Sequence, residues 1–280
     1  MQIIKNIAKL RETLDAERAN GKSVGLVPTM GALHEGHASL VRRSVKENDV
    51  TVVSIFLNPT QFNDPKDLER YPVTLESDCA ILEQCGAQIA FVPSVSEVYP
   101  EPDTRVFSYP PTDTVMEGER RPGHFNGVCQ IVSKLFYYTD PDRAYFGEKD
   151  YQQIAVIRRM VEDLKFRVNI IPCPVIREAD GLAMSSRNTL LATEEKQLAP
   201  NIYRILKEST TLGMSIEETK TWVTEQINAI PGLEVEYYSI VDGNTLGDIS
   251  DWNETPSIVG CITVYCGKTP IRLIDHIRYK

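Results

Sequence analysis

The sequence predicts an α/β protein in which a Rossmann-like, doubly wound parallel sheet is followed by a second, smaller α+β domain. Two patterns predict this class. Strand-like and helix-like segments alternate up to about residue 176, which is typical of right-handed βαβ units in a parallel sheet. Beyond that point, two helical segments are followed by three strand-like segments. We therefore expect two domains, residues 1–176 and residues 177–280.

The first βαβ unit lies near the N-terminus. Residues 23–27 form a short apolar run, and residues 36–47 carry apolar side chains at roughly helical spacing. Residues 50–57 are almost continuously apolar and β-branched, as in a parallel strand that is covered on both faces. Because ligands of such sheets gather at the carboxyl ends of the strands, we expect the site there.

The next segments repeat this alternation of helix and strand, and the segments after residue 176 do not. Three further helices are predicted, and each is followed by a strand: a helix at 75–85 and a strand at 88–92, a helix at 128–138 and a strand at 143–146, and a helix at 151–164 and a strand at 167–172. A loop over 177–188 then precedes two helices at 193–211 and 215–229 and three strands at 234–241, 257–265 and 271–277, with Gly243 and Gly267 as turn residues.

Composition excludes several classes of function. The chain has 280 residues and 42% hydrophobic residues, as expected for a globular protein. Its net charge is -9, from 30 Lys plus Arg and 39 Asp plus Glu, so it has no basic field that would attract nucleic acid. Its longest apolar runs are far shorter than the ~20 residues of a membrane span. We expect a cytoplasmic protein with neither nucleic-acid nor membrane partners.

The cysteines fit the same compartment. The six cysteines include no CxxC pair and no clustered Cys/His spacing. We therefore expect reduced, mostly buried thiols rather than a disulfide framework or a structural zinc site.

The most informative segment is Pro28-Thr-Met-Gly-Ala-Leu-His-Glu-Gly-His37, at the junction of a strand and a helix. Such a junction offers free backbone N–H groups and the positive end of a helix dipole to a phosphate. The segment is not a P-loop, because His37 and Ala38 stand where Lys and Ser or Thr are required. It matches neither the dinucleotide motif G-x-G-x-x-G nor the zinc motif H-E-x-x-H.

Two imidazoles therefore lie on one side of a helix's first turn, at His34 and His37, with Gly36 between them. The glycine lets a flat ring approach the backbone. A neighbouring polyphosphate would favour the protonated, doubly donating imidazole. The alternative is structural, with one histidine capping the helix and the other packed in the core.

The chain resembles the nucleotidyltransferase superfamily that carries the H-x-G-H tetrapeptide and, within it, the family of pantothenate synthetases, or pantoate-β-alanine ligases. The resemblance covers essentially the whole chain. It rests on five ordered motifs: residues 28–37, Phe56-Leu-Asn-Pro-Thr-Gln-Phe62, Arg121-Pro-Gly-His-Phe125, Phe146-Gly-Glu-Lys-Asp-Tyr-Gln-Gln153 and Met184-Ser-Ser-Arg-Asn188.

The resemblance implies a two-step, AMP-forming ligase. Pantoate would attack the α-phosphorus of ATP and release pyrophosphate, and the amine of β-alanine would then attack the pantoyl adenylate. Residues 1–176 would bind nucleotide and pantoate, and residues 177–280 would form the lid. Two alternatives remain open on the sequence: an adenylyltransferase with another acceptor, and a catalytically silent nucleotide-binding regulator on the same fold.

The resemblance also assigns residues. For ATP it implies Met30, Gly31, Ala32, Leu33, His34, Glu35, Gly36 and His37; Gly147, Glu148, Lys149 and Asp150; Met184, Ser185, Ser186 and Arg187; and Ile176 beside adenine. It implies Asn58, Gln61 and Gln153 for pantoate, with Gln61 also near β-alanine. Catalytic roles fall on His34, His37 and Lys149, and we favour electrostatic stabilisation of the leaving pyrophosphate by His37.

Several assignments have structural alternatives. Lys149 lies between two acids and would usually be a solvated surface residue. Residues 185–188 could be an N-cap region rather than a loop that closes over ATP. The resemblance implies a Mg²⁺ cofactor with Asp78 as the matched ligand, although Asp78 could be an exposed helix acid. It also implies a homodimer, and it leaves Arg121 and His124 without a chemical step.

Overall fold

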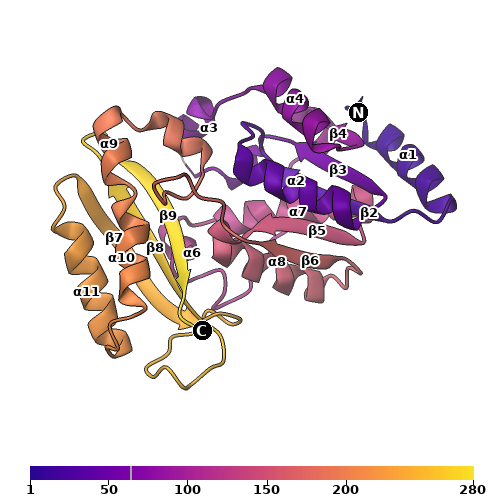
Figure 1. The fold of residues 1–280 in the computed structure, drawn as a ribbon. Coiled ribbons are helices and arrows are strands. Elements are labelled where there is room, and N and C mark those ends of the chain that lie inside the picture. The colour runs from indigo at the N-terminus through magenta and orange to yellow at the C-terminus, as the bar shows by residue number, and fades with distance from the viewer. Residues whose placement is uncertain (64) are drawn as a thin grey trace.

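The computed structural model describes residues 1–63 and 65–280, which form two sheets with their own helices (Figure 1). The first is a six-stranded parallel sheet in the order β1-β4-β3-β2-β5-β6, and the second is an antiparallel sheet in the order β7-β8-β9. The predicted fold class is confirmed. In the described residues, no helix combines the length and the apolar character that a bilayer crossing requires.

The parallel sheet contains β1 (Gln2–Ile4), β2 (Val24–Thr29), β3 (Val50–Ile55), β4 (Ile89–Phe91), β5 (Arg143–Gly147) and β6 (Asn169–Cys173). Its helices are α1 (Ile7–Ala19), α2 (Glu35–Glu47), α3 (Pro65–Arg70), α4 (Leu75–Cys85), α5 (Val95–Val98), α6 (Glu117–Arg120), α7 (His124–Thr139) and α8 (Tyr151–Asp163), with the 3₁₀ turns η1 (Pro59–Gln61) and η2 (Glu148–Asp150). The second sheet contains β7 (Leu233–Asp242), β8 (Ile258–Cys266) and β9 (Ile271–Arg278), and its helical segments are η3 (Ser186–Leu190), α9 (Thr193–Leu198), α10 (Asn201–Ser209) and α11 (Ile216–Asn228).

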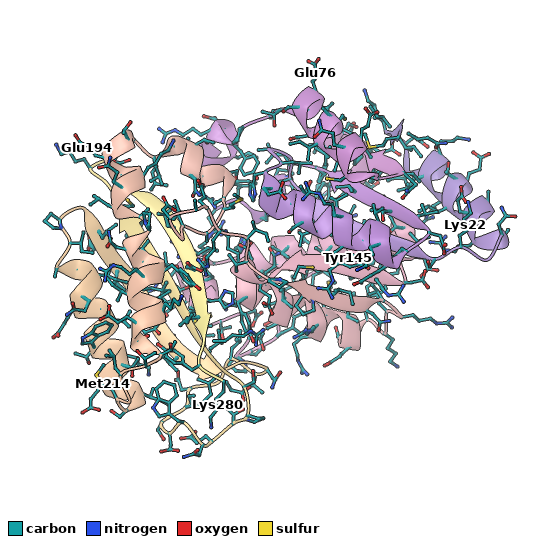
Figure 2. The ribbon with its side chains drawn as sticks, viewed as in Figure 1. Lys22, Glu76, Tyr145, Glu194, Met214 and Lys280 are labelled. Carbon is teal, nitrogen blue, oxygen red and sulfur yellow. The ribbon has the colours of Figure 1, made fainter. Side chains whose placement is uncertain are left out.

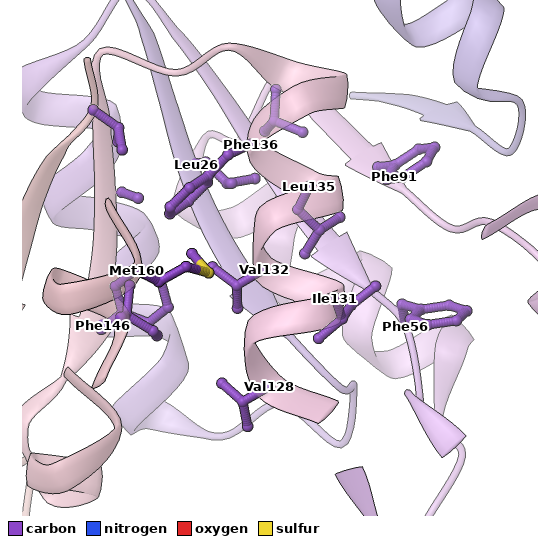
Figure 3. Close-up of a cluster of buried hydrophobic side chains, with 14 of the residues drawn as sticks. Leu26, Phe56, Phe91, Val128, Ile131, Val132, Leu135, Phe136, Phe146 and Met160 are labelled. Carbon is purple, nitrogen blue, oxygen red and sulfur yellow. The ribbon is translucent and has the colours of Figure 1, made fainter. Parts of the chain in front are cut away.

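Helices cover both faces of the parallel sheet. Buried side chains of α2 and α4 pack on one face, and those of α1, α7 and α8 pack on the other. Figure 3 shows the second layer, where Leu26 of β2 lies among Val132 and Phe136 of α7 and Met160 of α8. Full burial of each such side chain contributes about 1.5–3 kcal/mol.

Helix α2 can approach β2 closely because Gly25 has no side chain. A Cβ at Gly25 would lie 2.3 Å from Ser44 Oγ and 2.4 Å from Asn48 Nδ2. The C-terminal end of α2 is also tied to β5, since the hydroxyl of Tyr145 accepts from Asn48 Nδ2 at 2.8 Å and donates to Glu47 at 2.9 Å. The opposite end of α2, which carries the two histidines, therefore has a fixed position at the carboxyl ends of the strands.

Strands β2 and β5 are paired over only two positions, Gly25 with Arg143 and Leu26 with Ala144. Beyond them, β2 continues to Thr29 and β5 to Gly147 without further pairing to each other. The chain order also reverses here, since β3 and β4 follow on one side of β2 while β5 and β6 lie on the other. Such a switch point is where open α/β sheets bind ligands.

The structure contains short elements that were not predicted, strand β1 and helices α3, α5 and α6, and it divides one predicted helix. Strand β1 was not predicted, because three residues are too short to show a period. The single helix predicted over 193–211 is two helices, α9 and α10, which are interrupted at Pro200. Proline lacks an N–H and its ring clashes with the preceding turn, so one continuous helix cannot pass through it.

A buried ion-pair network joins the two sheets. Glu117 of α6 accepts two hydrogen bonds from Arg272 of β9, at 2.6 and 2.7 Å, and further ones from the hydroxyls of Tyr237 and Thr263. Burial raises the pKa of the Glu117 carboxyl, but the hydrogen bonds and charge of Arg272 outweigh it and hold that pKa at about 2. The network thus stays charged at neutral pH.

We expect Arg272→Met to lower the free energy of unfolding by about 3–5 kcal/mol, because it removes the hydrogen-bonded cation of the buried Glu117 carboxylate and leaves it with the more distant Arg121, at 3.8 Å. Arg204→Met is the matched control. Arg204 pairs with Glu208 on an exposed helix surface, so its loss should cost less than about 1 kcal/mol. Urea unfolding at neutral pH measures both, and equal effects would contradict the stabilising role of the network.

Candidate active site

Two connected cavities lie at the carboxyl ends of the parallel strands. The inner cavity has a volume of about 230 Å³ and follows β2, β3, β5 and β6. The outer cavity, of about 500 Å³, extends between this edge and the second sheet. Residues that line both are Tyr71, Arg121, His124, Lys149, Asp150, Gln153, Ser185, Ser186 and Arg187.

Both histidines of the first motif cap helix α2 through their ring nitrogens. His34 is the N-cap, and its Nδ1 accepts from the backbone N–H of Gly36 at 3.1 Å. His37 reaches back, so that its Nδ1 accepts from the backbone N–H of His34 at 3.3 Å. The two ring centroids are 4.1 Å apart, and both residues line the inner cavity.

This capping fixes the protonation of both rings. An Nδ1 that accepts a backbone N–H carries no proton, so each neutral ring carries its proton on Nε2. Burial and then the charge of Lys149 lower the pKa of His34 to about 4. Burial, His34 and Lys149 lower that of His37 to about 3. In the free protein the pair therefore consists of neutral single donors, whereas the protonated form was expected only beside a bound polyphosphate.

Gly36 makes this arrangement possible, as the sequence predicted. A Cβ at Gly36 would lie 2.8 Å from Cε1 and 2.9 Å from Nδ1 of His34. Only a residue without a side chain lets the His34 ring lie flat over the first turn of the helix.

The structure brings most of the predicted residues to the inner cavity, but not all of them. Those that line it are Met30, His34, Gly36, His37, Asn58, Gln61, Gly147, Lys149, Asp150, Gln153, Ile176, Met184, Ser185, Ser186 and Arg187. Those that do not line it are Gly31, Ala32, Leu33, Glu35, Asp78 and Glu148. Glu35 instead pairs with Arg42 on the surface, and Glu148 pairs with Arg278 of β9.

Lys149 is not the solvated surface lysine of the structural alternative. Its side chain is only 19% exposed, and its Nζ lies 3.8 Å from the carboxylate of Asp150. Its positive charge contributes to the lowered pKa values of both histidines, so the ammonium is near enough to disfavour protonation of their rings. Its ammonium therefore shares the inner cavity with two neutral N–H donors, and the guanidinium groups of Arg121 and Arg187 line that cavity too.

The segment that contains the two serines is a capped 3₁₀ turn. The hydroxyl oxygen of Ser185 accepts from the N–H of Arg187 at 3.3 Å, so an N-cap is present, although it begins η3 rather than the helix at Thr193. The N–H of Met184 donates to the carbonyl of Ile176 at 3.0 Å. This bond joins the two segments that the resemblance assigns to the nucleotide.

Asn58 and Gln61 form a buried amide pair. Asn58 is 1% exposed and donates to Gln61 Oε1 and to the carbonyl of Gly127, each at 3.1 Å. The hydroxyl of Tyr99 donates to its Oδ1 at 2.8 Å. Among the described residues, Gln61 Nε2 donates only to the thioether sulfur of Met30, at 3.0 Å. Sulfur is a weak acceptor, so a ligand oxygen can take its place and accept hydrogen bonds from the NH₂ group of Gln61.

Asp78 is not the exposed helix acid that one interpretation expected. It is 1% exposed, and both of its oxygens accept hydrogen bonds from protein groups: the backbone N–H groups of Ala32 and Leu33 and the hydroxyl of Thr74. It therefore supports the first motif from behind rather than facing the cavity.

Three of the residues that line both cavities received no role from sequence reasoning. The hydroxyl of Tyr71 lies 3.5 Å from Ser186 Oγ. His124 is buried, its Nδ1 donates to the carbonyl of Gln61 at 2.9 Å, and Arg121 lies 3.4 Å from its Nε2. The Arg-Pro-Gly-His-Phe motif could have indicated the last two, but Tyr71 stands alone in a polar segment and gives no such signal.

Known proteins resemble this chain over its full length. The family model described as pantoate-beta-alanine ligase matches residues 2–278. A pantothenate synthetase from Bacteroides fragilis (strain YCH46) is 60% identical over 282 residues, covering 100% of this chain and 99% of that protein. One from Porphyromonas gingivalis (strain ATCC BAA-308 / W83) is 57% identical, covering 100% of both.

Solved structures show the same resemblance. A pantothenate synthetase from Thermus thermophilus superposes with a TM-score of 0.93 at 42% identity, over 100% of this chain and 99% of that one. The pantoate-beta-alanine ligase of Francisella tularensis, complexed with "Beta-gamma ATP and Beta-alanine", gives a TM-score of 0.83 at 35% identity, over 100% of this chain and 98% of that one.

Stability should fall as the pH is lowered from about 6.5 to 4. Burial lowers the pKa of His37 and His124, to about 3 and about 4, so in this window the unfolded chain binds protons that the folded chain refuses. Each such histidine then costs about 1.4 kcal/mol per pH unit. Urea unfolding across the window measures the slope, which His124→Gln should reduce by about that amount. A slope unchanged by this substitution would contradict the assignment.

We expect Gly36→Ala to raise the pKa of His34 towards 6.5, because the new methyl group displaces the ring from its capping position and into solvent. Titration of the ring Cε1–H signals by NMR measures this shift. Gly147→Ala is the control, since a Cβ there meets no atom within 4 Å. The two variants should differ; a His34 pKa that stays near 4 in Gly36→Ala would contradict the capping geometry.

Proposed function

Because this chain belongs to the pantoate-beta-alanine ligase family, we propose that its two cavities carry out both half-reactions of that ligase, with its two neutral histidines and Lys149 holding the triphosphate. The chain is an ATP-dependent ligase that condenses pantoate with beta-alanine. The observation that carries the assignment of the site is the meeting of three chemical groups at one switch point: the capped histidine pair after β2, the amide pair after β3 and Lys149 after β5.

The first half-reaction is adenylate formation. A carboxylate oxygen of pantoate forms a bond to the α-phosphorus of ATP, the bond to the bridging oxygen breaks, and pyrophosphate leaves with the electron pair. Negative charge grows on the leaving group, so fixed N–H donors and a cation are the principal catalytic requirement. The Nε2–H groups of His34 and His37 and the ammonium of Lys149 supply them.

Neutral histidines suit this role better than imidazolium ions would. Their capping bonds hold the rings still before ATP binds, so no reorganisation is needed when charge develops. The leaving pyrophosphate does not require a proton, and a ring whose Nδ1 is occupied stays a donor at Nε2 throughout. We therefore assign to His37 electrostatic stabilisation rather than proton donation.

The 3₁₀ turn at Ser185, Ser186 and Arg187 faces the same cavity from the second sheet's side of the molecule. Two hydroxyls and a guanidinium are suitable phosphate donors. We assign the nucleotide's phosphates to this turn together with Lys149, and its adenine to the backbone near Ile176. Asp150, whose side chain is 47% exposed, is available to ribose hydroxyls.

We assign the binding of pantoate to the side-chain amide groups. Gln61 Nε2 exchanges its weak thioether acceptor for a hydroxyl or carboxylate oxygen, and Gln153, which lines both cavities, offers a second amide. Asn58 is engaged by protein partners on both its oxygen and its nitrogen, so we assign it to holding Gln61 rather than to direct substrate contact. In the second half-reaction the amine of beta-alanine attacks the acyl carbon, AMP leaves, and the amine loses one proton.

ATP is expected to arrive with Mg²⁺, which supplies neutralising charge at the phosphates. Among the side chains that the structure describes, no group of three or more His, Cys, Asp or Glu is arranged to hold a metal ion. Asp78, the ligand implied by the sequence, does not fit, since its oxygens are occupied and it is 1% exposed. We therefore propose that the ion is carried by phosphate oxygens and water.

Three further proposals complete the description. We propose a domain boundary near residue 176, and the end of β6 at Cys173 and the bridge that pairs Arg177 with Ala183 support it. A cytoplasmic location is supported by six unpaired cysteines, of which five are buried, since secreted proteins oxidise such thiols. A homodimer is proposed, to be checked by sedimentation at micromolar concentration.

His37→Ala should slow pantoyl adenylate formation by about 10²–10³-fold, the usual effect of removing one such donor. The rate is measured by single-turnover quench with ATP and pantoate, which separates it from product release. Addition of beta-alanine to preformed adenylate should remain near the unmodified rate. Omission of pantoate should abolish pyrophosphate release; release without it would indicate another acceptor, and no turnover with any acceptor would indicate a silent regulator.

A further inference from the structure

The backbone turn between β2 and α2 converges on one carboxylate. The N–H of Ala32 donates to Asp78 Oδ2 at 3.0 Å, and the N–H of Leu33 donates to Asp78 Oδ1 at 2.8 Å. Two successive N–H groups that face one anion form the concave arrangement that elsewhere binds phosphate. Here the anion is part of the protein.

The conformation of this turn is unusual enough to need such a partner. Gly31 has φ of 87° and Ala32 has φ of 51°, so both lie in the left-handed region, which an alanine adopts only at a cost. Leu33 is 9% exposed, so its N–H has little access to water as a substitute acceptor. The carboxylate satisfies both N–H groups and holds the turn against relaxation.

Asp78 itself is fixed on a rigid element. It lies in the first turns of α4, is 1% exposed, and receives a third hydrogen bond at Oδ1 from the hydroxyl of the N-cap residue Thr74, at 3.1 Å. A Cβ at Gly31 would come within 3.1 Å of its Oδ2, so the carboxylate lies directly against the turn. Helix α4 also packs on α2 through buried side chains, so the support and the supported helix move together.

A role in metal binding is disfavoured by the same contacts. A carboxylate offers about four acceptor positions, and three of these are filled by N–H and O–H donors. Mg²⁺ usually keeps several of its waters, and a side chain that is 1% exposed has no room for them.

We infer that Asp78 is a positioning residue of the ATP site: its carboxylate locks the turn at Gly31 and Ala32 and thereby sets where His34 begins helix α2 and where both histidine rings point. This inference rests on the proposed role of His34 and His37 as phosphate donors. Asp78 touches neither cavity, so it acts on ATP only through this turn.

The test compares two acids in the same helical turn. Asp78→Asn keeps the shape but sets an NH₂ group against one of the two backbone N–H donors. Glu76→Gln is the matched control, since Glu76 also lies in the first turn of α4 but points into solvent (Figure 2). The readouts are the single-turnover rate of adenylate formation, the rate of beta-alanine addition to preformed adenylate, and the Mg²⁺ concentration that gives half of the maximal rate.

Asp78→Asn should slow adenylate formation on the order of 10- to 100-fold, as expected for a misplacement of catalytic groups by a fraction of an ångström to an ångström. The addition of beta-alanine and the Mg²⁺ requirement should be unchanged, and Glu76→Gln should behave as the unmodified protein. An Asp78→Asn enzyme with unmodified rates would overturn the inference. So would a raised Mg²⁺ requirement with full recovery at high Mg²⁺, since that identifies a metal ligand.

If Asp78→Asn does not fold, Thr74→Val decides, because it removes only the hydroxyl that donates to Oδ1. A slowing of adenylate formation by about threefold, within the range of one lost hydrogen bond, supports the inference. No slowing would overturn it. An unmodified protein that releases no pyrophosphate with ATP and pantoate refutes the proposed function instead, whatever the variants do.

Discussion

The site depends on how far β2 and β5 remain paired. Hydrogen bonding between these neighbours stops at Leu26 and Ala144, and each strand then runs three further residues apart from the other. Pro28 contributes to this, because it has no N–H to offer a sheet partner. Continued pairing would fill the space between Thr29 and Gly147 with backbone. The separation instead leaves the inner cavity, with a histidine-bearing turn on one side and a lysine-bearing turn on the other.

The electrostatics of this cavity follow from burial rather than from accumulated charge. Lys149 is a cation close to two imidazoles, and burial keeps both imidazoles neutral. A polyphosphate therefore meets two directional N–H donors beside the ammonium of Lys149 and the guanidinium of Arg187, rather than two further cations at the histidines. The second sheet closes the outer side, and it is tied to the parallel domain by the Glu117–Arg272 pair and by Arg278, which pairs with Glu148 next to Lys149.

Sequence reasoning recovered the parts of this structure that have a local signal. The β-branched run after Val50 and the amphipathic segment before Glu47 have clear periods, and both elements are present. The grouping of Gln61, Lys149 and Ser185 came from resemblance, since each alone is an ordinary turn or surface residue, and the fold explains it through adjacent strand ends. The support given by Asp78 and the contact of Tyr71 with Ser186 had no such signal, because they join residues that are far apart in the sequence and follow no period.

Gly25 shows how far the influence of packing extends in this protein. It touches neither cavity, yet its missing side chain lets Ser44 and Asn48 bring α2 against β2, and the histidine pair lies at the other end of that helix. A genetic screen that starts from a defective substitution at Gly25 should therefore recover suppressors at Ser44 or Asn48, where smaller side chains restore the clearance. Among related enzymes, substitutions at these three positions are expected to occur together for the same reason, although none of the three residues contacts a ligand.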